Sequence, residues 1–326
     1  LIAFLSYMRT LNAKPELEAY LRLSGAGCGE WLAAMTELLG CRGITCGLTR
    51  PQGLVGSLSA LDVEAGLVCV LDVAQDMLLA DCCMPQRPLV ATIHGSAQIS
   101  SEGGPGVSAF PLIMIPAGQT FSLRISKNSR LVLVYPVSEL VPVWPRPGLD
   151  VALAGHIHRF LMKADYFQDH QDASRETLAL FERLERQLAT GRVELPEELP
   201  VLDRRLARVI EKIRSERDWD FDLQELANHS GASERNLYYL MKRETGMTPY
   251  RFYQRCRLIR VRKRLVDCQC DVPHISWYAA DEGFTHLGRF AALYREHFGE
   301  LPSETVQWRR RLLVEPVMEP ADFAMT

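Results

Sequence analysis

Two arginines, Arg235 and Arg289, could form specific hydrogen bonds with a base, since each lies near the start of an expected helix. A guanidinium group can donate two parallel hydrogen bonds to O6 and N7 of a guanine, a contact worth ~1–3 kcal/mol of base discrimination. Tyr238 and Tyr239 follow the first arginine and could contact thymine methyl groups or phosphates, although one of them is expected to pack in the core. Binding to phosphate or solvent stays open as the alternative for each arginine.

Both arginines follow a motif that the chain contains twice with the same internal spacing. The first copy is Leu223-x2-Leu226-Ala227-x3-Gly231-x-Ser233, and the second, 52 residues later, is Ile275-x2-Tyr278-Ala279-x3-Gly283-x-Thr285. Apolar residues three apart face a core, the alanine lets a second helix cross closely, the glycine supplies a left-handed turn residue and the hydroxyl caps the next helix. The repeat therefore predicts two helix-turn-helix units.

Local signals indicate where the helices of these units begin and end. Asp222 with Glu225 forms a capping pattern, Ser233 and Thr285 are expected to cap the second helix of each unit, and Pro249 follows a capping threonine. Both units close with the same glycine-x-x-proline spacing, Gly246–Pro249 and Gly299–Pro302. Between them, Pro249–Asp267 predicts one helix about 28 Å long at ~1.5 Å per residue. A connector of that length suits the ~34 Å that separates major-groove faces one helical turn apart.

The connecting helix carries a run of positive charge that has two interpretations. The run could bind DNA phosphates, or it could be a solvated helix face in which some members form ion pairs inside the domain. The second interpretation is favoured for most of its members, which are Arg251, Arg255, Arg257, Arg260, Arg262, Lys263 and Arg264.

These residues resemble the bacterial AraC/XylS family of transcription regulators over about 110 residues, from Leu202 to Arg311. The stretch from Glu282-Gly283-Phe284 through Phe290 and Tyr294 to Phe298-Gly299, with Pro302, is similar to the C-terminal signature of the family. The resemblance implies an all-α C-terminal domain with two helix-turn-helix units joined by a long helix. It also implies a transcription activator that binds double-stranded promoter DNA in the bacterial cytoplasm, with RNA polymerase and a small-molecule effector or protein as further partners.

The resemblance assigns the two DNA-reading helices to Ser233–Glu244 and Thr285–Glu296. The positions at which the family contacts bases carry Ser233, Arg235, Asn236, Tyr238, Tyr239, His286, Leu287, Gly288 and Arg289, and the expected DNA-backbone contacts are Lys242, Arg243 and Thr285. Two residues of the second helix depart from the family pattern. Ala292 stands where the family usually has arginine, and Gly288 has no side chain with which to read a base. The second helix is therefore expected to contribute mainly backbone contacts or shape readout.

The N-terminal part of the chain has the short apolar runs and turn residues of a sandwich or small barrel between Ile44 and Val137. The expected strands are Gly66–Val73, Leu89–Ile99, Leu112–Ile115, Thr120–Ile125 and Arg130–Tyr135, preceded by expected helices at Pro15–Leu23 and Glu30–Leu39. Family members often carry an effector-binding β domain here, so the resemblance implies a jelly-roll-like or cupin-like fold. The fold class expected for the whole chain is α+β and multidomain.

A proline-rich stretch at Val141–Gly148 predicts a domain boundary, because prolines cannot lie inside a helix. Two amphipathic helices follow, one marked by Leu153–Ala164 and one by an apolar seam at Thr177, Phe181, Leu184 and Leu188. The seam fits either packing within one chain or a homodimer interface of Phe181, Leu184 and Leu188. The expected domains are a regulatory domain (1–148), a helical dimerisation segment and acidic linker (149–200), a DNA-binding domain (201–313) and a tail (314–326).

Charge and composition bound the class of protein. Residues 201–313 hold 21 Lys and Arg against 16 Asp and Glu, an excess of five positive charges, whereas the remainder has 16 against 24. A basic domain joined to an acidic one hints at a polyanionic partner. No run reaches the ~20 apolar residues of a membrane helix, and the opening segment Leu1–Met8 lacks signal-peptide features, which favours the cytoplasm. The nine cysteines are expected to be free thiols in a reducing compartment.

Neither catalysis nor a bound metal or cofactor is expected. A cupin-type metalloenzyme domain is the alternative for the β region, but His156 and His158 fall in an expected helix, and His94 is isolated on an apolar strand, where it fits a structural role. No nucleophile elbow, Walker loop or dinucleotide fingerprint occurs. A second alternative, an architectural DNA-bending protein, does not account for the large acidic β domain.

Overall fold

A computed structural model describes residues 17–50, 53–101, 104–138, 140, 147–197, 202–268 and 274–314. The chain forms two compact units. Unit 1 comprises Leu1–Asp165, Ser174–Pro196 and Glu304–Thr326, and unit 2 comprises Tyr166–Ala173 and Glu197–Ser303. Sheets in the N-terminal part and helices in the C-terminal part confirm the expected α+β class. No helix within these ranges is long and apolar enough to cross a bilayer.

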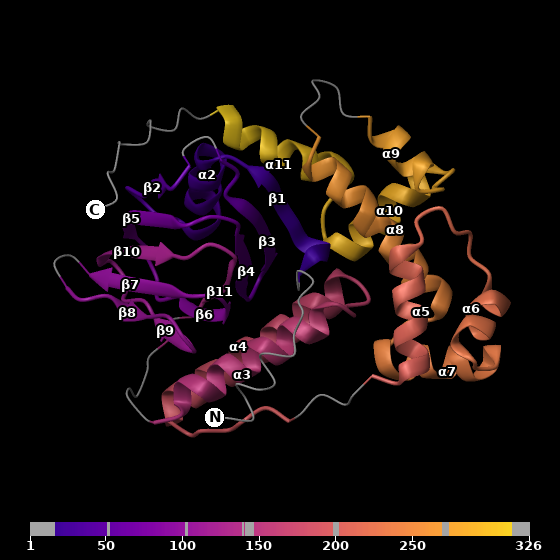
Figure 1. Cartoon of the computed structure of the whole chain (residues 1–326), viewed down its shortest axis with the longest axis horizontal. Coiled ribbons are helices and arrows are strands. Elements are labelled where there is room, and N and C mark those ends of the chain that lie inside the picture. The colour runs from indigo at the N-terminus through magenta and orange to yellow at the C-terminus, as the bar shows by residue number, and fades with distance from the viewer. Residues whose placement is uncertain are drawn as a thin grey trace. The chain divides into compact units, whose positions relative to one another are not determined.

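Unit 1 is built on two antiparallel sheets (Figure 1). The six-stranded sheet has the order β1-β3-β4-β11-β6-β9, with bounds Leu21–Ala26, Gly56–Val63, Gly66–Val73, Ser129–Pro136, Leu89–His94 and Leu112–Met114. The five-stranded sheet has the order β2-β5-β10-β7-β8, with bounds Thr45–Leu48, Met77–Cys83, Thr120–Ile125, Ala97–Ser101 and Val107–Ser108. Buried side chains from both sheets form one core cluster, so the two sheets face each other.

The burial of the strands follows from what covers each sheet. In β10, Phe121, Leu123 and Ile125 are buried and alternate with more exposed residues, as expected for a strand with one face in a core. In β4, by contrast, residues on both faces are buried, because a helix covers the outer face of the larger sheet. A Cβ atom at Gly66 would lie 2.9 Å from the ring of Phe181.

The helices α3 (Leu149–Ala164) and α4 (His170–Thr190) confirm the two expected amphipathic helices, and both extend further than the apolar marker residues. The helix α3 contacts β6 and β9 of the larger sheet, and the pair appears beside the sheets in Figure 1. The helix α3 and α4 from Ser174 onward lie in unit 1, while Tyr166–Ala173, which includes the first turn of α4, belongs to unit 2. The boundaries expected for a separate helical domain stay a prediction.

Two further helices complete the core of unit 1. The helix α2 (Cys28–Leu39) confirms the helix expected at Glu30–Leu39, and α11 (Pro302–Val314) contributes Trp308 and Leu312 to the same core cluster. Arg309 of α11 donates to Oε1 of Glu30 at 2.8 Å, and only 5% of the Arg309 side chain is exposed. The C-terminal helix therefore packs with the core of unit 1, although it follows the helices of unit 2 in the chain.

Unit 2 is helical. Its helices are α5 (Arg204–Ser215), α6 (Leu223–Ser230), α7 (Glu234–Thr245), α8 (Pro249–Val266), α9 (Ile275–Asp281) and α10 (Leu287–Phe298). Contacts join α6 to α7, α7 to α8, α8 to α9 and α9 to α10. The long helix α8 therefore lies between two short helix pairs, and its bounds agree with the expected connector to within one residue.

Some expectations about the N-terminal elements were wrong. Leu21–Leu23 belong to β1 rather than to a helix, because they pair with β3 in the sheet. The run Leu89–Ile99 is two strands, β6 and β7, in different sheets, since the chain reverses at Gly95, which has a φ of +78°. Most of the proline-rich boundary, Leu1–Met8, Cys270 and residues 315–326 lie outside the described residues.

Candidate nucleic-acid interface

The first helix pair, α6 and α7, is fixed by local capping. Gly231 ends α6 in the left-handed region with a φ of 72°, and the Ser233 hydroxyl caps α7 by accepting from the Asn236 amide at 3.3 Å. Asp222 caps α6 by accepting from the Glu225 amide at 3.0 Å. These three expectations are confirmed, and each depends on residues at most three apart in the chain.

One face of α7 is buried and the opposite face is exposed. Leu237 and Met241 belong to the core cluster of unit 2, and Leu240 is buried beside them in the helix. Tyr238 and Tyr239 are 48% and 60% exposed, so the expectation that one of them packs in the core was wrong. The leucines and the methionine already fill the core-facing positions of this helix. Both tyrosines therefore lie on the same exposed face as Arg235.

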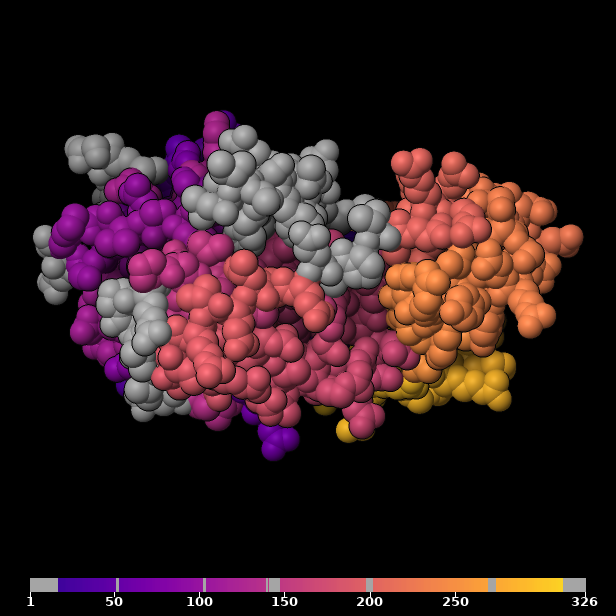
Figure 2. Space-filling view, turned by 90° about the horizontal axis from the view of Figure 1, so that it is seen from below, coloured from indigo at the N-terminus to yellow at the C-terminus, as the bar shows by residue number. Residues whose placement is uncertain are grey.

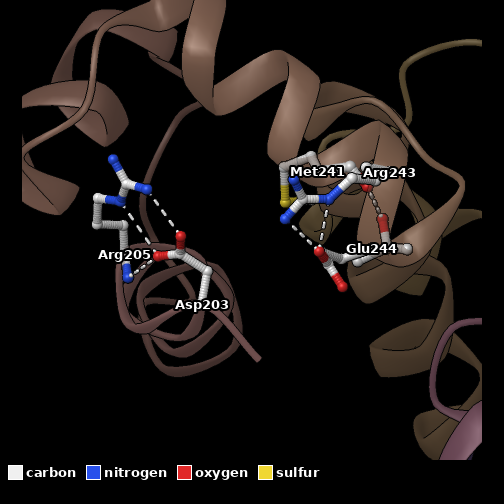
Figure 3. A network of polar contacts seen from close by, with 6 residues as sticks. Asp203, Arg205, Met241, Arg243 and Glu244 are labelled. Carbon is white, nitrogen blue, oxygen red and sulfur yellow. Dashed lines mark hydrogen bonds and ion pairs between the residues drawn. The ribbon is translucent and has the colours of Figure 1, made fainter. Parts of the chain in front are cut away.

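The positive charges at the end of α7 are occupied by groups of the protein. Figure 3 shows Arg243 directed toward Glu244, to which its Nε donates at 2.7 Å, and the Arg243 guanidinium lies 5.6 Å from the ring centroid of Tyr239. Lys242 Nζ donates to the carbonyl oxygen of Gly246 at 3.0 Å. Among the residues that the structure describes, no side chain pairs with Arg235. The charge best placed to meet a ligand is thus at the N-terminal end of α7.

The start of α5 carries a second ion pair, also drawn in Figure 3. Asp203 caps this helix, accepting from the backbone amide of Arg205 at 2.9 Å and from its guanidinium at 2.8 Å. These hydrogen bonds from Arg205 lower the pKa of Asp203 to about 2. Asp203 therefore stays charged at neutral pH, and its charge is matched by Arg205.

The second helix pair, α9 and α10, differs from the first. Thr285 was expected to cap α10, but the helix begins at Leu287 with His286 as its N-cap residue and without a side-chain cap. His286 has φ −112° and ψ 98°, an extended conformation, so it cannot be the first helical residue that a Thr285 cap requires. The expected start of the second DNA-reading helix was therefore wrong by two residues.

The exposed face of α10 carries little side-chain chemistry. Leu287 is 48% exposed, Gly288 has no atom within 4 Å of the place where a Cβ would lie, and Ala292 is exposed as well. Arg289 is exposed, and in the described part of the chain it has no ion-pair partner. Arg289 at the start of α10 and Arg295 in its last turn are the exposed side chains of this helix that offer paired hydrogen-bond donors.

The arginines of α8 are held by groups of unit 2, which confirms the interpretation favoured from the sequence. Arg251 binds Glu296 at 2.6 Å, Arg260 binds Glu282 at 2.7 Å, Arg262 binds Glu300 at 2.7 Å and Arg264 binds Asp281. Arg257 lies 5.1 Å from the ring centroid of Tyr253 and 5.2 Å from that of Phe284. The helix therefore uses most of its positive charge inside the unit.

The segment Tyr166–Ala173 was missed as a contributor to unit 2. Arg255 Nε donates to the carbonyl oxygen of Phe167 at 2.9 Å, and the ring of Tyr166 stacks on Phe252 with centroids 6.5 Å apart. Arg251 also lies 3.6 Å from a carboxylate oxygen of Asp169. Short-range patterns carry no signal for these contacts, since the partners are more than 80 residues apart in the chain.

The expected dimerisation residues lie inside unit 1. Phe181, Leu184 and Leu188 are 2%, 0% and 1% exposed within a single chain. The exposed large apolar residue of the same helix is Leu178, at 48%. This burial agrees with packing of the seam within one chain, rather than with a homodimer interface formed by these three residues.

The histidines of α3 are buried in the helix, as the sequence suggested. His156 Nε2 lies 2.7 Å from Nε2 of Gln187 and 2.8 Å from the carbonyl oxygen of Glu194. Burial lowers the pKa of His158 to about 4. His94 is exposed at the end of β6. Over the described residues, no group of three or more His, Cys, Asp or Glu side chains is arranged to hold a metal ion.

Comparison with known proteins places the similarity in the C-terminal third. A helix-turn-helix domain family matches residues 226–308. The XylDLEGF operon transcriptional activator 1 of Pseudomonas putida is 37% identical over 109 residues, which are 33% of this chain and 33% of that protein. The XylDLEGF operon transcriptional activator 2 of the same organism is 35% identical over 108 residues, 33% of this chain and 69% of that protein.

A solved structure also matches about a third of the chain. The crystal structure of a probable AraC family transcriptional regulator from Rhodopseudomonas palustris CGA009 is 31% identical, with 32% of this chain and 96% of that chain covered and a TM-score of 0.31. The chain matches only about a third, 33%, of the length of the XylDLEGF operon transcriptional activator 1.

Proposed function

Because the chain belongs to the AraC/XylS family of DNA-binding transcription regulators, we propose that it activates transcription by reading two adjacent major-groove segments of promoter DNA. The pairs α6–α7 and α9–α10 act as two helix-turn-helix units, with α7 and α10 as the reading helices. The regulator works in the cytoplasm and contacts RNA polymerase when bound upstream of a gene.

The observation that carries this proposal is the difference between the arginines of unit 2. Those of α8 are occupied by carboxylates, carbonyl groups and aromatic rings, whereas Arg235 and Arg289 are exposed on α7 and α10 and lack an ion-pair partner among the described residues. An exposed guanidinium that is not neutralised keeps both donors for a guanine. This contrast supports base reading by the two short helices rather than phosphate binding by the long one.

The two reading helices have unequal roles in this proposal. In α7, Ser233, Asn236, Tyr238 and Tyr239 accompany Arg235 at the proposed DNA surface, and Lys242 and Arg243 lie nearer the backbone of the DNA. In α10, His286 and Gly288 allow close approach, Thr285 binds a phosphate, and Arg289 alone reads a base. The bare surface around Gly288 supports an anchoring role for the second unit.

Unit 1 is proposed to control DNA binding. Its two facing sheets support the jelly-roll-like assignment, and a small molecule or a protein partner bound there would act as the effector. The expected domain scheme, with a regulatory part, a helical segment and a DNA-binding part, belongs to this proposal.

Selection of bound sequences from a random DNA library tests the function directly. The full chain should enrich a motif with two segments about 10–10.5 base pairs apart, one helical turn of DNA. Arg235→Ala should lower the affinity for that motif at least several-fold and leave non-specific binding nearly unchanged. Arg208→Ala, which removes an exposed arginine from α5, is the matched control and should change neither affinity. Equal loss on both DNAs would make Arg235 a phosphate contact, and no enriched motif would refute sequence-specific reading.

We further propose that two chains pair through the exposed face of α4. Arg175, Leu178 and Glu182 lie on this face, and residues from this part of the chain, in pink to salmon, lie at the surface in Figure 2. In an antiparallel pair centred at Leu178, the two exposed Leu178 side chains would bury one another.

Light scattering tests the pairing. Leu178→Asp should give monomers with an unchanged circular dichroism spectrum, whereas Leu195→Asp, at a residue 68% exposed in the segment after α4, should leave the mass unchanged. A dimer that survives Leu178→Asp would contradict this interface.

A further inference from the structure

Unit 1 contains a group of thiols that the DNA-binding function does not use. Cys28 is the first residue of α2, Cys41 follows that helix, Cys46 lies on β2 and Cys82 lies on β5. The strands β2 and β5 are paired, with Cys46 opposite Leu79. The Cys28 thiol donates to the backbone carbonyl oxygen of Cys46, and the neighbouring Cys82 lowers the pKa of Cys41. All four are free thiols in the structure.

The pair Cys28 and Cys46 differs from the other pair in its access to solvent. The Cys28 Sγ lies 3.8 Å from the carbonyl oxygen of Cys46, and Cys28 is half-buried while Cys46 is only 2% exposed. A solute can therefore reach the Cys28 side chain, whereas the neighbouring Cys46 side chain is buried. In the other pair, Cys41 and Cys82 are 0% and 2% exposed, so neither sulfur is open to a solute.

The electrostatics of the accessible pair favour a thiolate at Cys28. The hydrogen bond with the Cys46 thiol lowers the pKa of Cys28, against a smaller opposing effect of burial. The same hydrogen bond, with burial, raises the pKa of Cys46. The thiolate is the reactive form of a cysteine, and Cys28 is also the member of the pair that a solute can reach, so Cys28 would attack and Cys46 would resolve.

We propose that Cys28 and Cys46 form a reversible thiol–disulfide pair that hydroperoxides oxidise. In the first step the Cys28 thiolate attacks the terminal oxygen of the hydroperoxide, so that an S–O bond forms, the O–O bond breaks and the alkoxide leaves with a proton as an alcohol, or as water from hydrogen peroxide. In the second step the Cys46 sulfur attacks the sulfenic sulfur of Cys28. The S–S bond forms, the S–O bond breaks and water leaves with the Cys46 proton. Two thiols lose two electrons, which the peroxide gains, and a dithiol reductant reverses the change.

This inference is independent of DNA binding, because its chemistry requires only the two sulfurs and the oxidant. The neighbouring thiols are internal controls. Cys69 is fully buried, and burial raises its pKa, so it should stay reduced. Cys41 and Cys82 are neighbours of each other but are buried. If proximity of two thiols were sufficient for oxidation, this pair would also form a disulfide.

Peptide mapping of the full chain tests the assignment. Reduced protein is treated with hydrogen peroxide, the remaining thiols are alkylated, and the chain is cut with trypsin and a glutamate-specific protease. The second cut is needed because trypsin alone leaves Cys28 and Cys41 on one peptide, whereas cleavage after Glu30 and Glu37 separates them. The expected product joins residues 23–30 to residues 43–64 by a disulfide, since Pro51 blocks tryptic cleavage after Arg50, and it disappears on treatment with dithiothreitol. Cys28 should be consumed at least about tenfold faster than Cys41 or Cys82, as its thiolate character and access require.

Two variants complete the test. Cys46→Ser should remove the linked peptide and leave Cys28 as a sulfenic or sulfinic acid, whereas Cys82→Ser, the matched control, should leave the linked peptide unchanged. Circular dichroism of each variant checks the fold, and the wild-type map decides the question even if a variant is unfolded. Full alkylation of Cys28 after peroxide treatment, or a dominant disulfide between other cysteines, would overturn the proposal.

Discussion

Removal of one partner from the buried ion pair between Arg262 and Glu300 should strongly destabilise unit 2. Only 1% of the Arg262 side chain and 16% of the Glu300 side chain are exposed, and Nη1 lies 2.7 Å from Oε1. The guanidinium also donates to the Tyr294 hydroxyl at 3.3 Å and lies 4.9 Å from the ring centroid of Phe298. Removing one partner would leave the other charge in a poorly solvated place.

The size of the effect follows from this burial. Arg262→Met keeps the aliphatic volume and leaves the Glu300 carboxylate without its partner, which should cost about 3–5 kcal/mol of local stability. Arg264→Met is the matched control, since its partner Asp281 is 55% exposed and an exposed pair contributes only about 0–1 kcal/mol. The double variant Arg262→Met with Glu300→Gln should lose less local stability than the two single variants together, because it leaves neither charge buried without its counterpart.

Native-state amide hydrogen exchange is the suitable assay, because a chain with two compact units has no single free energy of unfolding. Amides in the middle of α8 should exchange roughly a hundredfold to several thousandfold faster in Arg262→Met, given about 1.4 kcal/mol per factor of ten. Acceleration of less than about tenfold, or single-variant effects that add within about 0.5 kcal/mol, would refute the claim that burial makes this pair strong.

Two further predictions concern α10 and the turn before it. Gly288→Ala should stabilise α10 by about 0.5–1 kcal/mol, since alanine has the higher helix propensity and the site is open. Gly283→Ala should instead destabilise unit 2, because Gly283 has a φ of +74° and the Arg257 side chain occupies the place of a Cβ. Amide hydrogen exchange of α9 and α10 compares the two variants, and slower exchange in both would contradict the argument.

His297 makes the stability of α10 sensitive to acid. Burial lowers its pKa to about 4, against ~6.5 in an unfolded chain. Between these values the unfolded state binds the proton and the folded state does not, so stability is complete above pH ~6.5 and falls by up to about 3 kcal/mol as the pH drops toward 4. Amide exchange of α10 across this range should show the loss, and His297→Gln should remove it; an unchanged pH dependence in the variant would exclude His297 as the cause.

Elements defined by neighbours in the chain could be located from the sequence. Ser233 and Asp222 cap their helices as expected, and α8 begins at Pro249, because a cap is a hydrogen bond between residues two or three apart. Strands with clear turn residues on both sides, such as β10, were also located correctly. The same local reasoning failed at Leu21–Leu23, where the strand is defined by its pairing with β3.

The candidate DNA-binding site divides in the same way. The repeated motif, the positions of Arg235 and Arg289 and the family membership follow from the sequence, since they depend on residue types at fixed spacing. Which arginines are free for a ligand was decided by the tertiary structure alone. Arg255 is bound to a carbonyl group 88 positions away in the chain, and Arg262 to a carboxylate on a segment beyond the second helix pair. A spacing pattern describes which residues share a helix face, but only the packing of distant segments determines which of those faces are covered and which charges are already paired.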